Sequence, residues 1–140
     1  MEWLILYLME DSIFTKIIRG EIPCHKVYED ARVLAFLDIH PKQPGHVLVV
    51  PKKQIEFVWD LPADDYTHLM AVAQKIGQHI RDVRRPKYVG LMVEGLGVPH
   101  AHVHVFPFNS SSEYYTQADM QAQPDHTALA QMAKTLEIRS

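Results

Sequence analysis

The most regular hydrophobic pattern of the chain lies between residues 62 and 85. Apolar residues recur there with the i, i+3, i+4, i+7 spacing of one helix face. The pattern predicts a long amphipathic helix whose single apolar face docks on a sheet. The residues of this face are Leu69, Val72, Ala73, Ile76, Ile80 and Val83.

Several shorter segments have the apolar, often β-branched composition and the bounding turn residues that are typical of strands. Because short turns rather than helices join most of them, we expect an antiparallel α+β sheet. A short helix over residues 13–19, N-capped at Asp11-Ser12, and another from about residue 125 complete the elements. The predicted strands cover residues 25–28, 33–39, 46–50, 88–93 and 100–106, and a polar loop covers 109–123.

Composition and charge narrow the class of protein. The 140 residues are 47% hydrophobic and 22% charged, an ordinary balance for a single globular domain, which we place at residues 9–140. A net charge of −3 offers no basic surface for nucleic acid. Cys24 is the only cysteine, so an internal disulfide is excluded, and a cytoplasmic location is the default expectation.

The first eight residues stand apart from this domain. Residues 3–8 are apolar, yet they are far too short to span a bilayer and lack the basic flank of a signal peptide. We therefore treat residues 1–8 as an N-terminal extension and expect no membrane partner. The extension could be an added strand, a segment that binds a partner, or the product of an upstream start codon, and we favour the last interpretation.

The segment 100–106 carries the candidate chemistry, because histidine alternates in it with small or apolar residues, at His100, His102 and His104. Successive side chains of a strand point to opposite faces, so the three imidazoles are expected on one face. Neighbouring histidines then lie roughly 6.5 to 7 Å apart, at ~3.3 Å rise per residue. The residues expected to pack into the core behind them are Ala101, Val103 and Val105.

Two uses fit such a row of imidazoles. Alternate histidines can bind one zinc ion from the same side of a strand. Alternatively, a neutral imidazole attacks a phosphorus atom, its neighbours hold the phosphoryl oxygens, and a covalent intermediate forms. Histidine suits this second use, because its ordinary pKa of about 6.5 leaves it largely neutral near pH 7. A polar face that repeats histidine by chance is the weakest interpretation.

The flanking sequence favours chemistry at phosphorus. Gly95 and Gly97 lie just upstream, in a turn that ends at Pro99. Their backbone N–H groups could approach phosphate oxygens closely, although glycine also suits an ordinary turn. A zinc site needs no such loop.

The run His-Ala-His-Val-His-Val-Phe resembles the signature of the histidine triad superfamily. The resemblance extends to three further segments, in the order found in the Hint-type branch, and covers residues 11 to 108. It implies a HIT-like fold, with a five-stranded antiparallel sheet, one long helix and one or two short helices, and a homodimer whose protomers pair to extend the sheet. The three segments are 12–23 (SIFTKIIRGEIP), 34–39 (LAFLDI) and 44–53 (PGHVLVVPKK).

The resemblance assigns roles to the histidines. In that family the middle histidine of the triad is the nucleophile, which here is His102, and it forms a nucleotidyl-histidine that water then hydrolyses. His104 would bind the phosphate and assist the leaving group. His100 and His46 would complete the proton and hydrogen-bond network. For His46, a structural role at the start of a strand is the competing interpretation.

The resemblance also implies a nucleotide-binding pocket. Asp38 matches the acidic residue that holds the ribose hydroxyls, although a carboxylate at a strand end could equally serve a turn. Gly97 and Val98 belong to the loop that meets the phosphate. Six apolar positions match the pocket that sandwiches the base, where composition alone would predict core, and these are Ile13, Phe14, Ile17, Ile22, Phe36 and Ile39.

The chain departs from the family pattern in two places. In the loop before the triad, Leu96 and Gly97 stand where relatives often carry a glutamine and a small hydroxyl residue. Val93 is the nearest match to an asparagine that contacts the phosphate or the leaving group. The loop is therefore expected to offer only backbone donors, with no polar side chain to contact the leaving group.

The second departure concerns metal. Ser12 and Thr15 stand where many bacterial relatives have a zinc-binding Cys-x-x-Cys. Cys24 and His25 remain nearby, but two ligands do not make a structural zinc site. We therefore expect no metal and no other cofactor.

These observations predict an enzyme acting on a purine nucleotide, with an AMP or GMP moiety. The candidate substrates are a nucleoside 5′-phosphoramidate, an adenylyl conjugate or a dinucleoside polyphosphate. Two alternatives stay open, namely a nucleotide-binding module without turnover and a metalloprotein using the three triad histidines. The complete histidine set argues against the binding module, because binding alone would not require His102.

Overall fold

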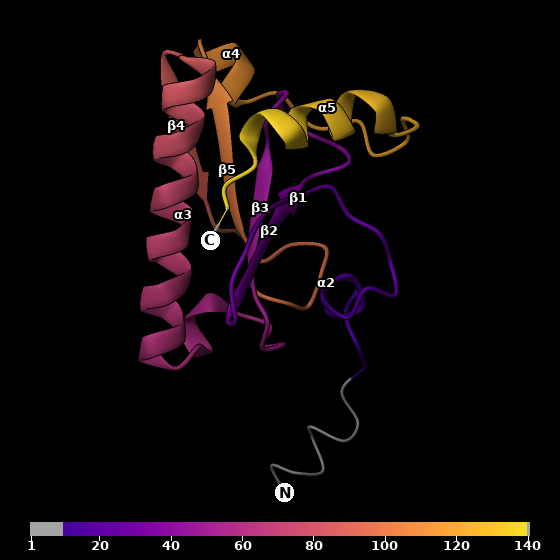
Figure 1. Ribbon diagram of the computed structural model, residues 1–140, viewed down its shortest axis with the longest axis vertical. Coiled ribbons are helices and arrows are strands. Elements are labelled where there is room, and N and C mark those ends of the chain that lie inside the picture. The colour runs from indigo at the N-terminus through magenta and orange to yellow at the C-terminus, as the bar shows by residue number, and fades with distance from the viewer. Residues whose placement is uncertain (1–9, 140) are drawn as a thin grey trace, which may run out of the picture.

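The sheet predicted from the strand-like segments is present in the computed structural model, which describes residues 10–139. Its five strands are all antiparallel and lie in the order β1-β2-β3-β5-β4 (Figure 1). The predicted α+β class is therefore confirmed. The strands are β1 (Lys26–Glu29), β2 (Val33–Leu37), β3 (Val47–Pro51), β4 (Tyr88–Met92) and β5 (Val103–Phe108).

The long helix α3 (Ala63–Arg84) lies along one face of this sheet (Figure 1). The predicted apolar face is buried at Leu69, Val72, Ala73, Ile76 and Ile80. Val83, in the last turn, is 41% exposed, so its predicted place on that face is wrong. The remaining helices are α2 (Ile13–Ile18), the 3-10 helix η1 (Val58–Asp60), α4 (Ser111–Tyr114) and α5 (His126–Leu136).

Helix α4 lies inside the segment predicted as a polar loop. Its N-cap is Ser110, whose hydroxyl oxygen accepts a hydrogen bond from the Glu113 N–H at 3.2 Å. One capped turn of this kind has no hydrophobic period to reveal it in the sequence.

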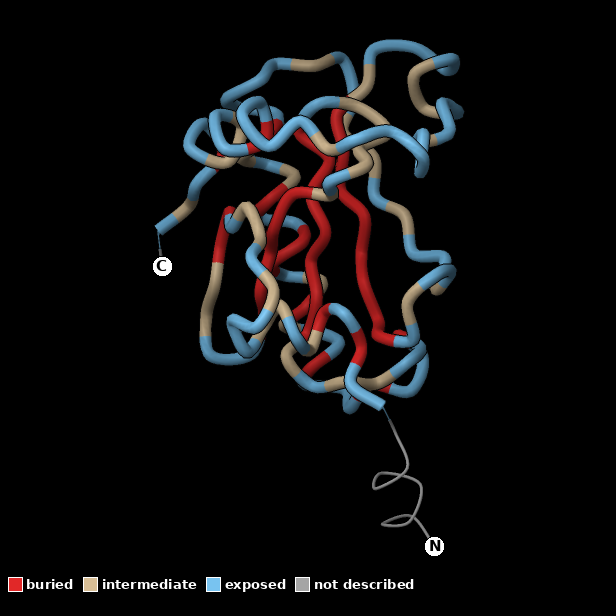
Figure 2. Tube along the Cα trace, turned by 90° about the vertical axis from the view of Figure 1, so that its right-hand side faces the viewer, coloured by how far each residue is buried: buried red, intermediate tan, exposed pale blue. Residues whose placement is uncertain are grey.

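The central strands are buried on both faces, and Figure 2 shows them as the buried centre of the molecule. On the α3 side, Ala35 and Leu37 of β2 join the main core. On the other side, Leu34 and Phe36 of β2 pack with Phe14 of α2 in a second, smaller cluster. The alternation of side chains along β2 thus divides the interior into two layers.

Three predicted strand starts need correction. Strand β1 begins at Lys26 rather than His25, β3 at Val47 rather than His46, and β5 at Val103 rather than His100. The Ala101 N–H donates to the Ile55 oxygen at 2.7 Å, outside the ladder with β3. Pairing with β3 starts at Val103, opposite Val49.

The predicted N-terminal extension, residues 1–8, lies outside the described residues. Among residues 10–139, no helix combines the length and the apolar composition needed to cross a membrane.

Candidate functional site

Four histidines gather where β3 and β5 run side by side. His104 lies in β5 between Leu48 of β3 and Met92 of β4. His46 directly precedes β3, and His100 and His102 lead into β5. All four are at most 8% exposed. The predicted alternation is confirmed, because the core on the α3 side contains Ala101, Val103 and Val105.

A hydrogen bond determines which nitrogen of the His102 ring is free. The Nδ1 atom lies 2.7 Å from the backbone oxygen of His100. Because a carbonyl oxygen can only accept, Nδ1 carries the proton and Nε2 keeps its lone pair. Phe14 of α2 packs edge-on against this ring, with centroids 5.2 Å apart. His102 therefore presents the unprotonated nitrogen that a nucleophile needs.

A chain of hydrogen bonds fixes the opposite tautomer in His104. The backbone N–H of Lys42 donates to Nδ1 of His46 at 3.0 Å, so His46 holds its own proton on Nε2. That Nε2 lies 2.9 Å from Nδ1 of His104 and donates to it. His104 therefore keeps its proton on Nε2. This Nε2 is buried and has no hydrogen-bond partner within residues 10–139, so the chain ends in a donor that lacks an acceptor.

The surroundings keep these imidazoles neutral. Burial, the neighbouring His104 and the Lys42 cation lower the pKa of His46 to about 3. Burial, with His102 and Lys42, lowers the pKa of His104 to about 4. Burial also lowers the pKa of His100. His46 and His104 are thus both neutral at pH 7, as a single proton between their facing nitrogens requires.

Asp38 lies beside this chain, just after the end of β2. Its Oδ1 accepts a hydrogen bond from the His40 N–H at 2.9 Å, and its Oδ2 lies 3.8 Å from His46 Nε2. Burial raises the pKa of this carboxyl group. The turn role considered from the sequence is thus present at Oδ1, while Oδ2 is left for another partner.

The same residues do not make a ready metal site. Ligand atoms of Asp38, His46 and His104 lie within 4.8 Å of one another. However, His46 Nε2 and His104 Nδ1 share a proton with each other, and a cation would have to replace it. The donor set is committed to hydrogen bonding and does not fit a resident metal.

The apolar residues expected around a base fall into three groups. Phe14, Ile17 and Phe36 belong to the second cluster, with Phe14 and Phe36 in edge contact at 5.6 Å, and Val98 of the predicted phosphate loop packs against the same cluster. Ile22 is half-buried and belongs to neither core cluster of the described residues. Ile13 and Ile39 are exposed at 48% and 42%, so they can form only an outer rim.

The loop between β4 and His100 lies against the triad. Its backbone is left-handed at Gly95 (φ 71°) and Gly97 (φ 87°), a conformation that favours glycine at both positions. Glu94 places Oε1 3.6 Å from His104 Nε2, while Leu96 is 69% exposed. Sequence reasoning missed Glu94, since nothing in its spacing relates it to His104.

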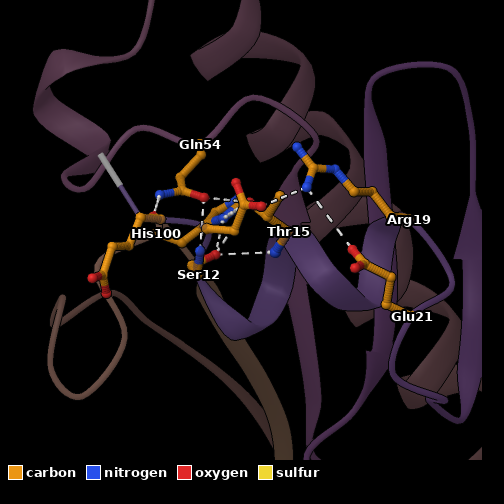
Figure 3. Close-up of polar contacts among 8 residues, drawn as sticks. Ser12, Thr15, Arg19, Glu21, Gln54 and His100 are labelled. Carbon is orange, nitrogen blue, oxygen red and sulfur yellow. Dashed lines mark hydrogen bonds and ion pairs between the residues drawn. The ribbon is translucent and has the colours of Figure 1, made fainter. Parts of the chain in front are cut away.

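His100 is bound differently from the other two triad members. Both of its ring nitrogens are occupied, Nε2 by the Pro51 oxygen at 2.7 Å and Nδ1 by the Ser12 hydroxyl at 2.8 Å. Gln54 and Thr15 adjoin this contact (Figure 3). No sequence pattern assigned Gln54 a role. Ser12 was expected as the N-cap of the helix, which is confirmed, and Ser12 and Thr15 were otherwise noted as replacements for cysteine.

Comparison with known proteins identifies the family of the chain. The family model described as HIT domain matches residues 19–111, which is more than half of the chain. The chain belongs to the HIT domain family. The histidine-rich strand of this HIT protein therefore lies within the matched region, as do Asp38, His46 and the loop of Glu94.

Relatives and solved structures extend the match. An uncharacterized HIT-like protein of Methanocaldococcus jannaschii is 41% identical over 99 residues, which cover 68% of this chain and 77% of that protein. A hypothetical histidine triad nucleotide-binding protein of Sulfolobus tokodaii has a TM-score of 0.77 at 25% identity, covering 88% and 87% of the two chains. A zinc-bound histidine triad family protein of Mycobacterium smegmatis has a TM-score of 0.73 at 26% identity, covering 89% and 88%.

The hydrogen-bond pattern generates a prediction that is independent of any substrate. Long-range ¹H–¹⁵N spectra at pH 7 should show His46 and His104 with the proton on Nε2 and His102 with the proton on Nδ1. Because the pKa values of His46 and His104 lie at about 3 and 4, their signals should stay unchanged between pH 7 and about pH 5. Protonation of either ring above pH 5, or an Nδ1–H tautomer at His46, contradicts the proposed chain.

Proposed function

We propose that this HIT protein transfers the nucleotidyl group of a purine nucleotide to His102 and then to water or another acceptor. One observation carries the proposal. The Nε2 atom of His102 keeps its lone pair, and the buried Nε2–H of the neighbouring His104 lacks an acceptor. The centroids of the two rings are 5.0 Å apart. Displacement at phosphorus requires a nucleophile and a donor for the phosphoryl oxygen, and these two groups supply them.

The steps account for every bond. The lone pair of His102 Nε2 forms a P–N bond, while the bond from phosphorus to the leaving group breaks and the leaving atom takes the electron pair. The His104 N–H holds a phosphoryl oxygen whose charge grows in the transition state, and it assists the leaving group. Water then attacks phosphorus and releases a proton to solvent, the P–N bond breaks, and the lone pair returns to His102.

The rest of the nucleotide has matching contacts. Oδ2 of Asp38, which is free of backbone hydrogen bonds, can accept from a ribose hydroxyl. The apolar side chains of Phe14, Ile17 and Phe36 pack together beside the triad and would border a purine base. The backbone N–H groups at Gly97 and Val98 lie in the loop that would face the phosphate. The name of the Sulfolobus tokodaii relative, a nucleotide-binding protein, agrees with this assignment.

The leaving group defines the substrate class, and three classes are candidates: a nucleoside 5′-phosphoramidate, an adenylyl conjugate and a dinucleoside polyphosphate. A second candidate function is nucleotide binding without turnover. It is favoured by the loop, in which Val93 and Leu96 offer no polar side chain for a leaving group and Glu94 adds a negative charge. A turnover screen over the three classes distinguishes the two functions.

We also propose that two protomers pair to extend the sheet. Strand β1 at one edge is packed against α5, whereas β4 at the other edge is only partly buried. Tyr88 and Leu91 on β4 are exposed at 55% and 46%. An unpaired edge strand with apolar side chains is a natural surface for a second copy.

Replacing the nucleophile is the decisive test. His102→Ala should lower kcat by about a thousandfold or more, because no neighbouring group can supply the covalent path. Nucleotide binding should survive, since the base and ribose contacts lie elsewhere. The wild-type reaction, quenched with labelled substrate, should carry an acid-labile nucleotidyl group on His102. His126→Ala, a change of an exposed histidine on α5, is the matched control. Near-normal turnover of His102→Ala, or a label on another histidine, would refute the assignment.

Glu94 provides a second test. Its carboxylate lies beside the donor that would hold the phosphate, so Glu94→Gln should lower the Kd for a nucleoside monophosphate by roughly three- to tenfold at low salt. Isothermal titration measures the effect, and added salt should reduce it. Glu137→Gln removes the same charge at the C-cap of α5 and should leave the Kd unchanged. Equal affinities of wild type and Glu94→Gln would place the phosphate away from His104.

The dimer is tested by mass in solution. Sedimentation at micromolar concentration should give twice the chain mass for the wild type and the monomer mass for Leu91→Lys, because a buried charge opposes edge pairing. Met120→Lys, in the segment between α4 and α5, should stay dimeric. A monomeric wild type removes the dimer proposal.

A further inference from the structure

A second polar cluster joins the triad at His100, and its other members have no assigned role in catalysis. We call it the Ser12 cluster, and it consists of Ser12, Thr15, Gln54 and His100 (Figure 3). Its members come from the first turn of α2, from the segment after β3 and from the entry to β5. Ser12 and His100 are 4% and 0% exposed, so their polar atoms depend on one another for hydrogen bonds.

The proton positions in the Ser12 cluster follow from one fixed acceptor. The Pro51 oxygen can only accept, so His100 donates from Nε2 and holds a lone pair on Nδ1. The hydroxyl of Ser12 then donates to that Nδ1 at 2.8 Å. The same hydroxyl oxygen accepts the Thr15 N–H at 3.0 Å, which makes Ser12 the N-cap of α2.

Gln54 completes the pattern from the other side. Its Oε1 accepts from the Thr15 hydroxyl and from the Ser12 N–H, the latter at 2.9 Å. Its Nε2 donates to the Glu10 oxygen at 2.7 Å. One arrangement of protons thus serves all contacts of the Ser12 cluster that are 3.0 Å or shorter, while the longer contacts of the Thr15 hydroxyl with Ser12 and His100 carry no proton.

The position of this cluster raises the question of metal, because the family resemblance matches Ser12 and Thr15 to a zinc-binding Cys-x-x-Cys and the Mycobacterium smegmatis structure is zinc-bound. The residues of this chain do not fit zinc. Neutral hydroxyl and amide oxygens replace the thiolates that structural zinc sites use. The oxygens of Ser12 and Gln54 are already engaged by N–H groups, and the His100 lone pair is engaged by Ser12.

We propose that the Ser12 cluster is a metal-independent clamp that holds His100 in one orientation and thereby aims the ring of His102. The link is the backbone oxygen of His100, which accepts the His102 Nδ1–H at 2.7 Å. With both ring nitrogens of His100 bound, that oxygen has a fixed position. Ser12 and Gln54 are positioning residues in this scheme and do not touch the reacting atoms.

Helix α2 supports the clamp by side-chain packing in addition to the hydrogen bonds. Ser12 caps the helix on which Phe14 is placed, and the Phe14 ring contacts His100 and His102 at 5.8 and 5.2 Å between centroids. Loss of the Ser12 hydroxyl therefore weakens both contacts that hold the His102 ring, the hydrogen bond through His100 and the packing of Phe14. The effect should appear in turnover more than in substrate binding.

The test begins with the wild-type protein, purified without a histidine tag. We expect substoichiometric zinc, no change in activity or melting temperature with chelator, and His100 in the Nε2–H form in long-range ¹H–¹⁵N spectra. Stoichiometric zinc that supports folding or activity overturns the proposal. So does an Nδ1–H form of His100. These readouts do not require that the substrate class be known.

Variants then separate positioning from stability. Ser12→Ala should shift the His100 Nδ1 resonance toward that of an unbonded ring nitrogen, and lower kcat about tenfold with little change in KM. Ser12→Thr should restore both. Ser110→Ala removes the serine N-cap of α4 and controls for the loss of a cap alone.

An unshifted His100 resonance, or equal losses of kcat in Ser12→Ala and Ser110→Ala, refutes the clamp. If no substrate is turned over, the proposed function fails while the His100 resonances still decide on the clamp. Should Ser12→Ala fail to fold, Gln54→Ala gives the same comparison of resonances and kcat.

Discussion

Two imidazole rings that face each other in a protein interior can coexist only when a single proton lies between them. His46 and His104 are in this position, with 2.9 Å between the facing nitrogens. Two protons would set two N–H donors against each other, and no proton would oppose two lone pairs. The backbone N–H of Lys42 decides the direction, because it occupies His46 Nδ1. The donor that His104 presents to the triad follows from that direction.

The direction of this hydrogen bond also determines which group His104 presents to the triad. With its Nδ1 accepting from His46, the His104 ring has to expose its remaining N–H toward the triad. In His102 the backbone oxygen of His100 places the proton on Nδ1 instead. The lone pair of His102 Nε2 and the donor N–H of His104 therefore belong to neighbouring rings. This polarity is set by a loop residue and by main-chain atoms, and no charged side chain is needed. The site thereby stays receptive to an anionic substrate.

Much of the fold follows from the sequence. The period of α3 predicted the helix, the apolar and β-branched segments predicted the strands, and the alternation of residues 100–106 predicted the face on which the histidines gather. The start of β5 did not follow, because Ala101 pairs with Ile55 instead of the β3 ladder, and no local pattern reveals a long-range backbone contact. Helix α4 is a single turn and has no period at all.

The site was predicted less completely, for a similar reason. The alternation indicated the three triad histidines, and the family resemblance added His46 and Asp38. A tautomer depends on the partner of each nitrogen, and neither source identified those partners. His100 illustrates this, since the pattern of the triad treats it as equivalent to His102. Its two nitrogens are instead bound to Pro51 and Ser12, which no spacing rule connects to it. Gln54 and Glu94 gain their roles in the same way, through folding alone.

The division between rigid and variable parts of the site has a chemical meaning. In the proposed reaction the nucleophile, His102, directly precedes β5 and the donor, His104, lies in β5 between β3 and β4. The His100 oxygen orients the first ring and the His46 side chain orients the second. The groups near the leaving atom come from the loop around Glu94 and Leu96, both largely exposed. A change in the loop can therefore alter which leaving group is accepted without disturbing how phosphorus is attacked. Since Glu94 repels phosphate at the very donor that must bind it, a substrate whose leaving group carries positive charge would offset that repulsion, whereas a polyphosphate would increase it.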